Sequence, residues 1–142
     1  MIAASVLDKD WVEEVKRRRD SRGLFIAGGL LQYFTEEENR EIFACLAENF
    51  PRAEMSFQTM APSLISRLAQ YSVLSQMGSK VALPSGPDDS EQVSALHPKI
   101  EFVREIPLLE WRYDQLPEPV RQRLSPAMAK QLLKIVHVRF QE

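Results

Sequence analysis

The sequence has little of what would tie the protein to a disulfide, a membrane or a nucleic acid. Cys45 is the only cysteine among 142 residues, which excludes an internal disulfide and a thiolate cluster for zinc. The net charge of −2 gives no electrostatic reason to expect nucleic acid. No apolar run approaches the roughly 20 residues that span a bilayer, and no signal-peptide pattern opens the chain. We therefore expect a cytoplasmic protein with neither nucleic acid nor a membrane among its partners.

Short motifs of hydrolytic and metal chemistry are also missing. No pair of histidines or carboxylates has a metal-ligand spacing such as H-E-x-x-H, and no G-x-S-x-G motif supports a hydrolase. His97 precedes Pro98 in a predicted loop, and His137 alternates with valines in a predicted strand. A surface role and a structural role are expected for these two histidines. The sequence indicates no metal site and leaves the catalytic residues unknown.

The composition is that of an ordinary globular domain. Apolar residues make up 44% and charged residues 27% of the chain. A chain of 142 residues suits one domain, spanning residues 1–142, that buries roughly 68–70% of its unfolded surface.

One stretch has the pattern of a strand, a glycine turn and a helix. Leu24–Ala27 is wholly apolar, as in a strand buried on both faces of a sheet, and Gly28 and Gly29 end it. Thr35 and Glu38 have the spacing of a capping box, and an apolar stripe then runs to Phe50. Such a unit belongs to a parallel α/β sheet, in which ligands bind beyond the carboxyl ends of the strands. The turn at residues 28–34 is the predicted site.

The remaining elements are read from local patterns. The chain before this unit predicts a helix capped by Asp8 or Asp10. The later segments predict a strand at 53–60, a helix from Pro62, a loop or lid at 78–94, an edge strand at 100–108, helical pieces at 111–129 and a terminal strand at 135–140.

Several of these segments together resemble a known enzyme family. The stretch FIAGGLLQYFTEEENREIFACLAENFPRAEMSFQT, preceded by SVLDKDW and followed by HPKIEFVREI and KIVHVRF, resembles the tetracenomycin-type polyketide O-methyltransferases and the related leucine carboxyl methyltransferases. The resemblance implies an α/β, Rossmann-like sheet that uses S-adenosylmethionine, with the last of seven strands antiparallel. It also implies methyl transfer to an oxygen of a polyketide or a carboxylate.

The segments that bind the cofactor in that family have no counterpart in this sequence. The family holds S-adenosylmethionine mainly by a glycine-rich turn after its first strand and an acid after its second, and this sequence contains no G-x-G. The resemblance therefore covers the carboxyl-terminal half only: about four strands, the last antiparallel, with helices on both faces.

Five residues are predicted to bind the cofactor, two of them from the resemblance and three from the glycine turn. Asp8 and Trp11 match the family's D-x-x-W segment near the adenine, although Asp8 could instead cap a helix. Gly28 stands where leucine carboxyl methyltransferases carry a glutamate, and Gly29 completes the turn. Tyr33 could close over a ligand or pack under the next helix.

Two functions from different classes are compatible with the sequence. The first is an O-methyltransferase, incomplete and inactive alone, whose other half comes from another chain. The second is a non-catalytic oligomeric or binding module derived from the same fold. In the family's sheet the Leu24–Ala27 strand is central, so its loss of a neighbour predicts a homo-oligomer joined at this edge, or a chain that supplies the missing half.

Overall fold

The computed structural model describes residues 2–18, 22–60 and 90–142. The predicted helix after Pro62 and residues 78–89 of the predicted loop or lid lie outside the described residues. The elements, in chain order and with η for a 3-10 helix, are α1 (Asp10–Arg17), β1 (Leu24–Ala27), η1 (Leu31–Tyr33), α2 (Glu36–Asn49), β2 (Glu54–Met60), η3 (Ser90–Ala95), β3 (Ile100–Pro107), η4 (Tyr113–Gln115), α4 (Glu118–Arg121), α5 (Pro126–Leu132) and β4 (Leu133–Phe140).

The predicted strand–turn–helix unit is present. The Thr35 hydroxyl accepts the N–H of Glu38, and the Glu38 carboxylate accepts the N–H of Thr35 at 2.7 Å, so both halves of the capping box form. The helix α2 then buries an apolar stripe against the sheet, consisting of Ile42, Phe43, Leu46 and Ala47. Its C-cap residue is Phe50, immediately before Pro51, as the pattern predicts.

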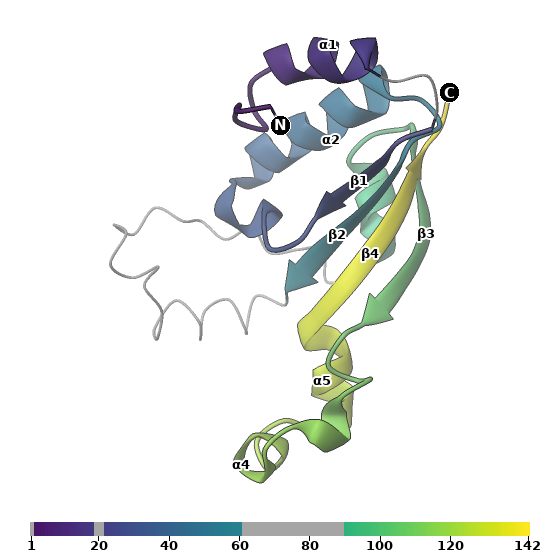
Figure 1. The fold of residues 1–142 in the computed structure, drawn as a ribbon. Helices are drawn as coiled ribbons and strands as arrows, with labels where there is room; N and C mark the ends of the chain where they lie inside the picture. Colours follow the sequence, from purple (N-terminus) through teal and green to yellow (C-terminus); the bar gives the residue numbers. More distant parts are fainter. Residues whose placement is uncertain (1, 19–21, 61–89) are drawn as a thin grey trace.

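The four strands form one sheet in the order β1-β2-β4-β3. Strands β1 and β2 are parallel, whereas β4 lies antiparallel between β2 and β3. The prediction of an antiparallel last strand is therefore confirmed, as is the edge position of the strand that ends in Pro107. Strands β1, β2 and β3 point the same way, so their carboxyl ends meet at one edge of the sheet (Figure 1).

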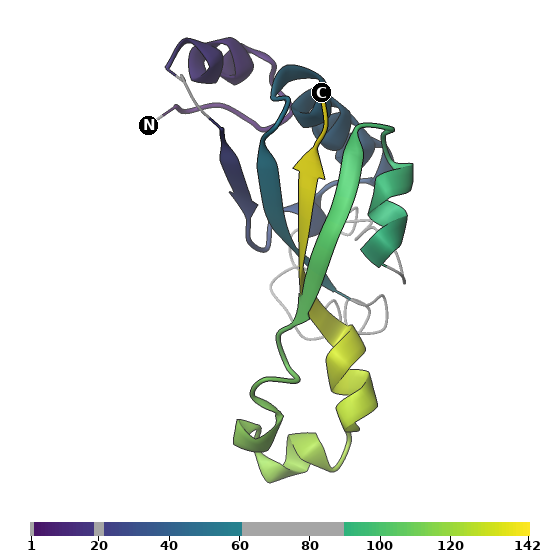
Figure 2. The same cartoon turned by 90° about the vertical axis from the view of Figure 1, so that its right-hand side faces the viewer.

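The core lies on one face of the sheet. Side chains from α1, α2 and η3 pack there against alternate residues of the strands, such as Phe57, Val136 and Val138, which are 3% exposed or less. Figure 2 shows these helices on the same side of the strands. The sequence predicted helices on both faces, but the described helices cover only this one.

The opposite face is open at β1. Leu24 is 60% exposed and Ile26 is 77% exposed, whereas Phe25 and Ala27 point into the core. The prediction of a strand buried on both faces is wrong for the described chain, because β1 is an edge strand and no described helix covers its outer face. An apolar run alone does not say whether covering elements are present.

The segments flanking β3 complete the fold. Residues 90–94 of the predicted loop are not loop: they belong to η3, whose Val93 is buried in the core. The sequence did not predict η3, because Val93 stands among polar residues and the apolar residues around it do not recur with a helical period.

After β3, the predicted helical pieces form η4, α4 and α5, which extend beyond the carboxyl end of the strand (Figures 1 and 2). None of the described helices combines the length and apolar character needed to cross a lipid bilayer.

Candidate functional site

The backbone after β1 is accessible at the two glycines. Gly28 is exposed, and a Cβ placed on it would meet no heavy atom within 4 Å. Gly29 has φ +63°, a conformation that residues with a side chain rarely adopt. The turn therefore combines a left-handed residue with open space beside the backbone, which allows a ligand to approach the main chain closely.

A buried amide of α2 holds the rest of this turn. The Asn39 side-chain Nδ2 donates to the carbonyl oxygen of Leu31 at 3.0 Å and to that of Phe34 at 3.4 Å. Asn39 is only 9% exposed, and its Oδ1 has no hydrogen-bond partner. The sequence analysis missed this residue. The available signal was its position one helical turn before Ile42, where a polar residue interrupts the apolar stripe.

Tyr33 lies on the same turn and faces solvent. It is 51% exposed, and its backbone N–H donates to the carbonyl oxygen of Leu30 at 3.1 Å. The alternative that it packs under the next helix is therefore wrong. Its ring is available beside the turn, and contact with a cofactor stays a prediction.

Asp8 closes a turn rather than capping a helix. Its Oδ2 accepts the N–H of Ser5 at 3.0 Å, and its own N–H donates to the Ser5 carbonyl at 3.1 Å. The N-cap residue of α1 is Lys9, which makes no side-chain capping bond, so neither Asp8 nor Asp10 is the predicted cap. The Asp8 carboxylate is exposed, and its role toward a cofactor stays a prediction.

Trp11 is engaged inside the protein. Its indole stacks on Phe50, with the ring centroids 6.0 Å apart and the planes at 7°. The indole Nε1–H donates to the carbonyl oxygen of Val6 at 3.1 Å, and Phe25 meets Phe50 edge-on. The indole N–H and one face of the Trp11 ring therefore connect α1 to the core. No hydrogen bond joins Trp11 or Asp8 to the glycine turn in the part of the chain that the structure describes.

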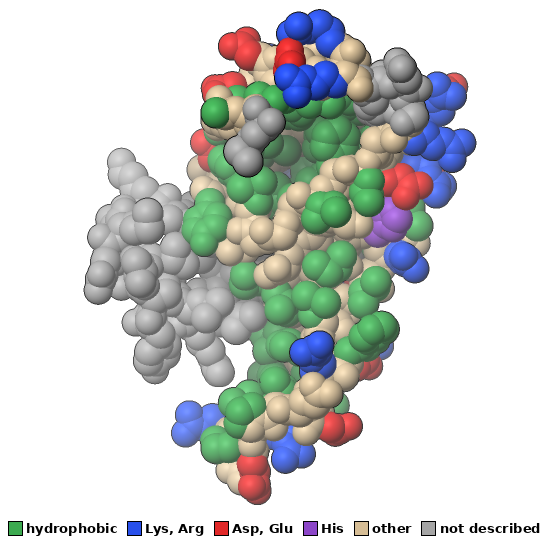
Figure 3. All heavy atoms as spheres, in the orientation of Figure 1, with side chains coloured by type: hydrophobic (Ala, Val, Ile, Leu, Met, Phe, Trp, Pro, Cys, Tyr) green, Lys and Arg blue, Asp and Glu red, His purple; other side chains and the backbone are tan. Residues whose placement is uncertain are grey.

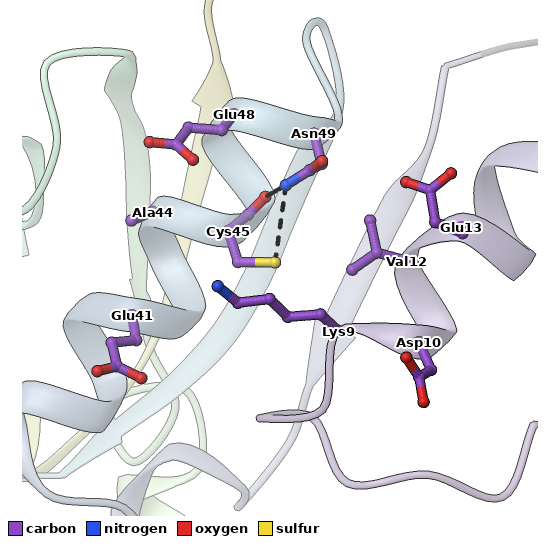
Figure 4. A pocket seen from close by; sticks show the side chains of 9 residues that line it. All are labelled: Lys9, Asp10, Val12, Glu13, Glu41, Ala44, Cys45, Glu48 and Asn49. Atoms are coloured by element: carbon purple, nitrogen blue, oxygen red, sulfur yellow. Dashed lines mark hydrogen bonds between the residues drawn. The ribbon is translucent and has the colours of Figure 1, made fainter.

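A hollow of about 650 Å³ lies between α1 and α2 (Figure 4). Its lining residues are Lys9, Asp10, Val12, Glu13, Glu41, Ala44, Cys45, Glu48 and Asn49. Burial raises the pKa of the Cys45 thiol above its ordinary value. The hollow contains none of the five predicted site residues, and its many carboxylates do not suit an anionic ligand.

A charged network occupies the open face at the amino end of β2. The Glu54 carboxylate lies 2.8 Å from His137 Nε2 and 3.3 Å from the guanidinium of Arg139, which also approaches Glu101 at 3.6 Å. The hydrogen bonds from His137 and Arg139 lower the pKa of Glu54. Because β1 and β2 are parallel, this network lies at the opposite edge of the sheet from the glycine turn.

The strand order β1-β2-β4-β3, with β4 antiparallel, is that of a methyltransferase-type, Rossmann-like fold. A solved structure from Thermobifida fusca YX, assigned to the methyltransferases, matches with a TM-score of 0.63 and 16% identity over 98% of this chain and 53% of that one. The likeness extends to a protein that is 34% identical over 74 residues, the tetracenomycin polyketide synthesis O-methyltransferase of Streptomyces glaucescens. The predicted fold and the predicted resemblance are therefore both confirmed.

These matches cover only part of the relatives. The tetracenomycin match takes in 52% of this chain and 26% of that enzyme, and this chain spans about half the length of the Thermobifida protein. The N-methyltransferase NodS of Bradyrhizobium japonicum matches more weakly, with a TM-score of 0.45 and 11% identity over 87% of this chain and 55% of that one. No protein-family model matches the sequence.

Proposed function

We propose that this chain is the carboxyl-terminal half of an S-adenosylmethionine-dependent O-methyltransferase, acting on a polyketide or carboxylate acceptor. The observation that carries the proposal is the similarity to the tetracenomycin O-methyltransferase, in a chain whose β1-β2-β4-β3 sheet has the methyltransferase fold. The similarity to a polyketide enzyme favours a polyketide acceptor. The single cysteine favours the cytoplasm as the compartment.

The glycine turn fits one side of the cofactor. Gly28 and Gly29 would let it approach the main chain, because no neighbouring atom fills the place of a Gly28 Cβ. The free oxygen of the Asp8 carboxylate would accept a ribose hydroxyl, and the exposed ring of Tyr33 would border the ligand. S-adenosylmethionine supplies the methyl group when it is bound. Because the sequence lacks the glycine-rich G-x-G turn that holds the cofactor in the family, we expect the chain alone to bind the cofactor weakly.

In this proposal the described residues mainly position the cofactor and the methyl acceptor. Methyl transfer depends on proximity and in-line alignment more than on acid–base groups. Asn39 fixes the turn on which the cofactor would rest, through its bonds to Leu31 and Phe34. The segment after β3 starts at the same end of the sheet and exposes Trp111 and Met128, which are 83% and 45% exposed. These side chains offer apolar surface to an acceptor.

Calorimetric titration with S-adenosylhomocysteine tests the proposal. The titration compares this chain alone with this chain mixed with the part of the tetracenomycin enzyme that precedes the matched residues. We expect a Kd weaker than about 100 μM, or roughly −5.5 kcal/mol, for the chain alone and tighter binding for the mixture. Gly28→Val should abolish the tighter binding of S-adenosylhomocysteine by the mixture, because its side chain fills the open space beside the turn. Ala127→Val, at an exposed position of α5, should leave that binding unchanged. A mixture that forms a complex without binding the nucleoside would overturn the proposal.

A non-catalytic binding module is the second candidate. The observation that favours it is the lack of any G-x-G in the sequence, together with the engagement of Trp11 by Phe50 and Val6. This alternative predicts a folded complex in which tritiated S-adenosylmethionine transfers no methyl group to any polyketide acceptor. Methyl incorporation into an acceptor by the mixture would exclude it.

A further inference from the structure

We infer that Trp111 determines acceptor specificity: its exposed indole stacks on a planar aromatic ring of the methyl acceptor and so favours aromatic acceptors over aliphatic ones. The inference deepens the proposed function and rests on it for the identity of the ligand as a methyl acceptor. The binding of an aromatic ring by Trp111 can be measured without methyl transfer. The proposed function and the ring-binding site can therefore be tested separately.

The side chain of Trp111 lies almost entirely in solvent. It is 83% exposed, more than any other large hydrophobic residue that the structure describes. Among the described residues, none makes a hydrogen bond or a ring contact with this side chain. Single exposed apolar residues are common on protein surfaces, but tryptophan is highly buried on average because its side chain is so large. A free indole face is therefore a candidate binding surface.

The backbone on both sides of Trp111 is held in place. The Leu108 N–H donates to the carbonyl oxygen of Leu133 at 2.9 Å, which ties the start of the segment after β3 to the first residue of β4. The Tyr113 hydroxyl donates to the carbonyl oxygen of Leu124 at 2.7 Å, and Leu124 is buried. An indole presented from a fixed backbone loses little conformational freedom when a ligand binds, so this position suits recognition.

Trp111 also lies at the edge of the sheet where ligands bind in folds of this kind. Strand β3 ends at Pro107, and the segment after it extends beyond the carboxyl ends of the strands (Figures 1 and 2). Strands β1 and β3 are three strand spacings apart, or about 14 Å, because β2 and β4 lie between them. An extended acceptor stacked on Trp111 would lie across this edge toward the glycine turn.

A planar aromatic ring fits this surface better than a saturated ligand or a protein partner. Offset stacking of two aromatic rings stabilises their contact beyond the area that they bury, and a saturated ring cannot form this stack. Glu110 and Arg112, on either side of Trp111 in the sequence, are exposed and charged. Figure 3 shows charged side chains among the hydrophobic ones at this end of the molecule. The surface is therefore a local platform and not a wide apolar patch of the roughly 800 Å² that each partner buries in a stable protein interface.

Titration of the 142-residue chain with 2-naphthoate, followed by NMR of the two indole N–H groups, tests the inference. We expect the Nε1–H signal of Trp111 to shift with a Kd below about 1 mM. The signal of Trp11, whose indole N–H donates to Val6, should stay in place and serves as the internal control. Decahydro-2-naphthoate has the same carbon skeleton and charge but no flat ring, so it should bind at least tenfold more weakly.

Two variants separate stacking from general apolar contact. Trp111→Leu keeps an apolar side chain without an indole and should weaken 2-naphthoate binding at least tenfold, as followed by the signals of the naphthoate itself. Val120→Ala shortens another exposed apolar side chain of the same segment, on α4, and should change the Kd less than twofold. Both positions are exposed, so both variants should keep the circular dichroism spectrum of the unmodified protein.

Four results would overturn the inference. They are a lack of 2-naphthoate binding, a shift of the Trp11 signal in place of the Trp111 signal, equal affinity for the saturated acid, and a Trp111→Leu variant that binds as well as the unmodified chain. A dimer of the chain that Trp111→Leu dissociates would also overturn it, because the indole would then contact a second copy. Stacking at Trp111 without nucleoside binding by the mixture upholds the aromatic site and defeats the proposed function. Nucleoside binding by the mixture without a shift at Trp111 does the reverse.

Discussion

The Nδ2 of Asn39 lies 3.0 Å from the carbonyl oxygen of Leu31, so a buried side chain of α2 holds the turn that follows β1. The same nitrogen reaches the Phe34 carbonyl, which ties both ends of η1 to one residue. The conformation of the glycine turn is thereby coupled to the packing of the helix after it. This coupling gives a buried polar side chain of α2 a structural role.

Removal of this amide should destabilise the protein. Asn39→Ala removes the amide donor from the carbonyls of Leu31 and Phe34, although the Leu31 carbonyl still accepts the Phe34 N–H. We expect a loss of about 1–3 kcal/mol in the free energy of unfolding. Arg40→Ala, at the adjacent exposed position with a surface ion pair to Glu36, should change it by less than about 0.5 kcal/mol. Urea denaturation measures both values. Equal effects of the two substitutions would contradict the assigned role.

The two glycines of the turn should respond differently to alanine. Gly29→Ala forces a side chain into φ +63° and should lower the stability by about 1–2 kcal/mol. Gly28→Ala meets no atom within 4 Å and should leave the unfolding midpoint nearly unchanged. Thermal denaturation of the two variants is the measurement. A larger loss at Gly28 than at Gly29 would show that the turn has another conformation.

The two tryptophans should differ in both stability and fluorescence. Trp11→Ala removes the stack on Phe50 and the bond to Val6, so we expect a loss of about 3 kcal/mol. Trp111 is 83% exposed, so Trp111→Ala should stay within about 0.5 kcal/mol. The emission that remains in Trp111→Ala should lie at shorter wavelength than that of Trp11→Ala. An identical emission maximum in the two variants would argue against the partly buried position of Trp11.

The stability should depend on pH through Glu54. Hydrogen bonds from His137 and Arg139 lower the pKa of Glu54 in the folded protein. The ionised carboxylate therefore stabilises the fold at pH values above its ordinary pKa, and this contribution is lost as the pH falls through the lowered value. Glu54→Gln should lower the urea midpoint at neutral pH, and the difference from the unmodified protein should shrink in acid. The control Glu101→Gln, which loses only the 3.6 Å contact to Arg139, should have a smaller effect.

The thiol of Cys45 should react slowly. Burial raises its pKa, so a smaller fraction is thiolate at mildly alkaline pH than for a free cysteine. Alkylation by iodoacetamide, followed by mass spectrometry, should be slower in the folded protein and reach the free-cysteine rate in urea. Lys9→Gln should slow it further, because the Lys9 charge favours the thiolate. Faster alkylation in Lys9→Gln would contradict this placement of the two side chains.

Much of the local structure follows from the sequence alone. Thr35 and Glu38 specify where α2 begins, since the capping box needs only residues three apart. The alternation of Met55 and Phe57 specifies a half-buried strand, and Pro107 restricts β3 to an edge. The resemblance to the tetracenomycin enzyme was also readable from several short segments in a fixed order.

Other features depend on contacts between residues far apart in the chain. Only the tertiary structure inserts β4 between β2 and β3, leaves Leu24 and Ile26 uncovered, and stacks Trp11 on Phe50. The sequence determined which side chains are apolar and which backbone conformations are favoured locally. The tertiary structure decided which of these groups have a partner, because burial depends on the presence of a neighbouring element and not on the pattern of the residue's own segment.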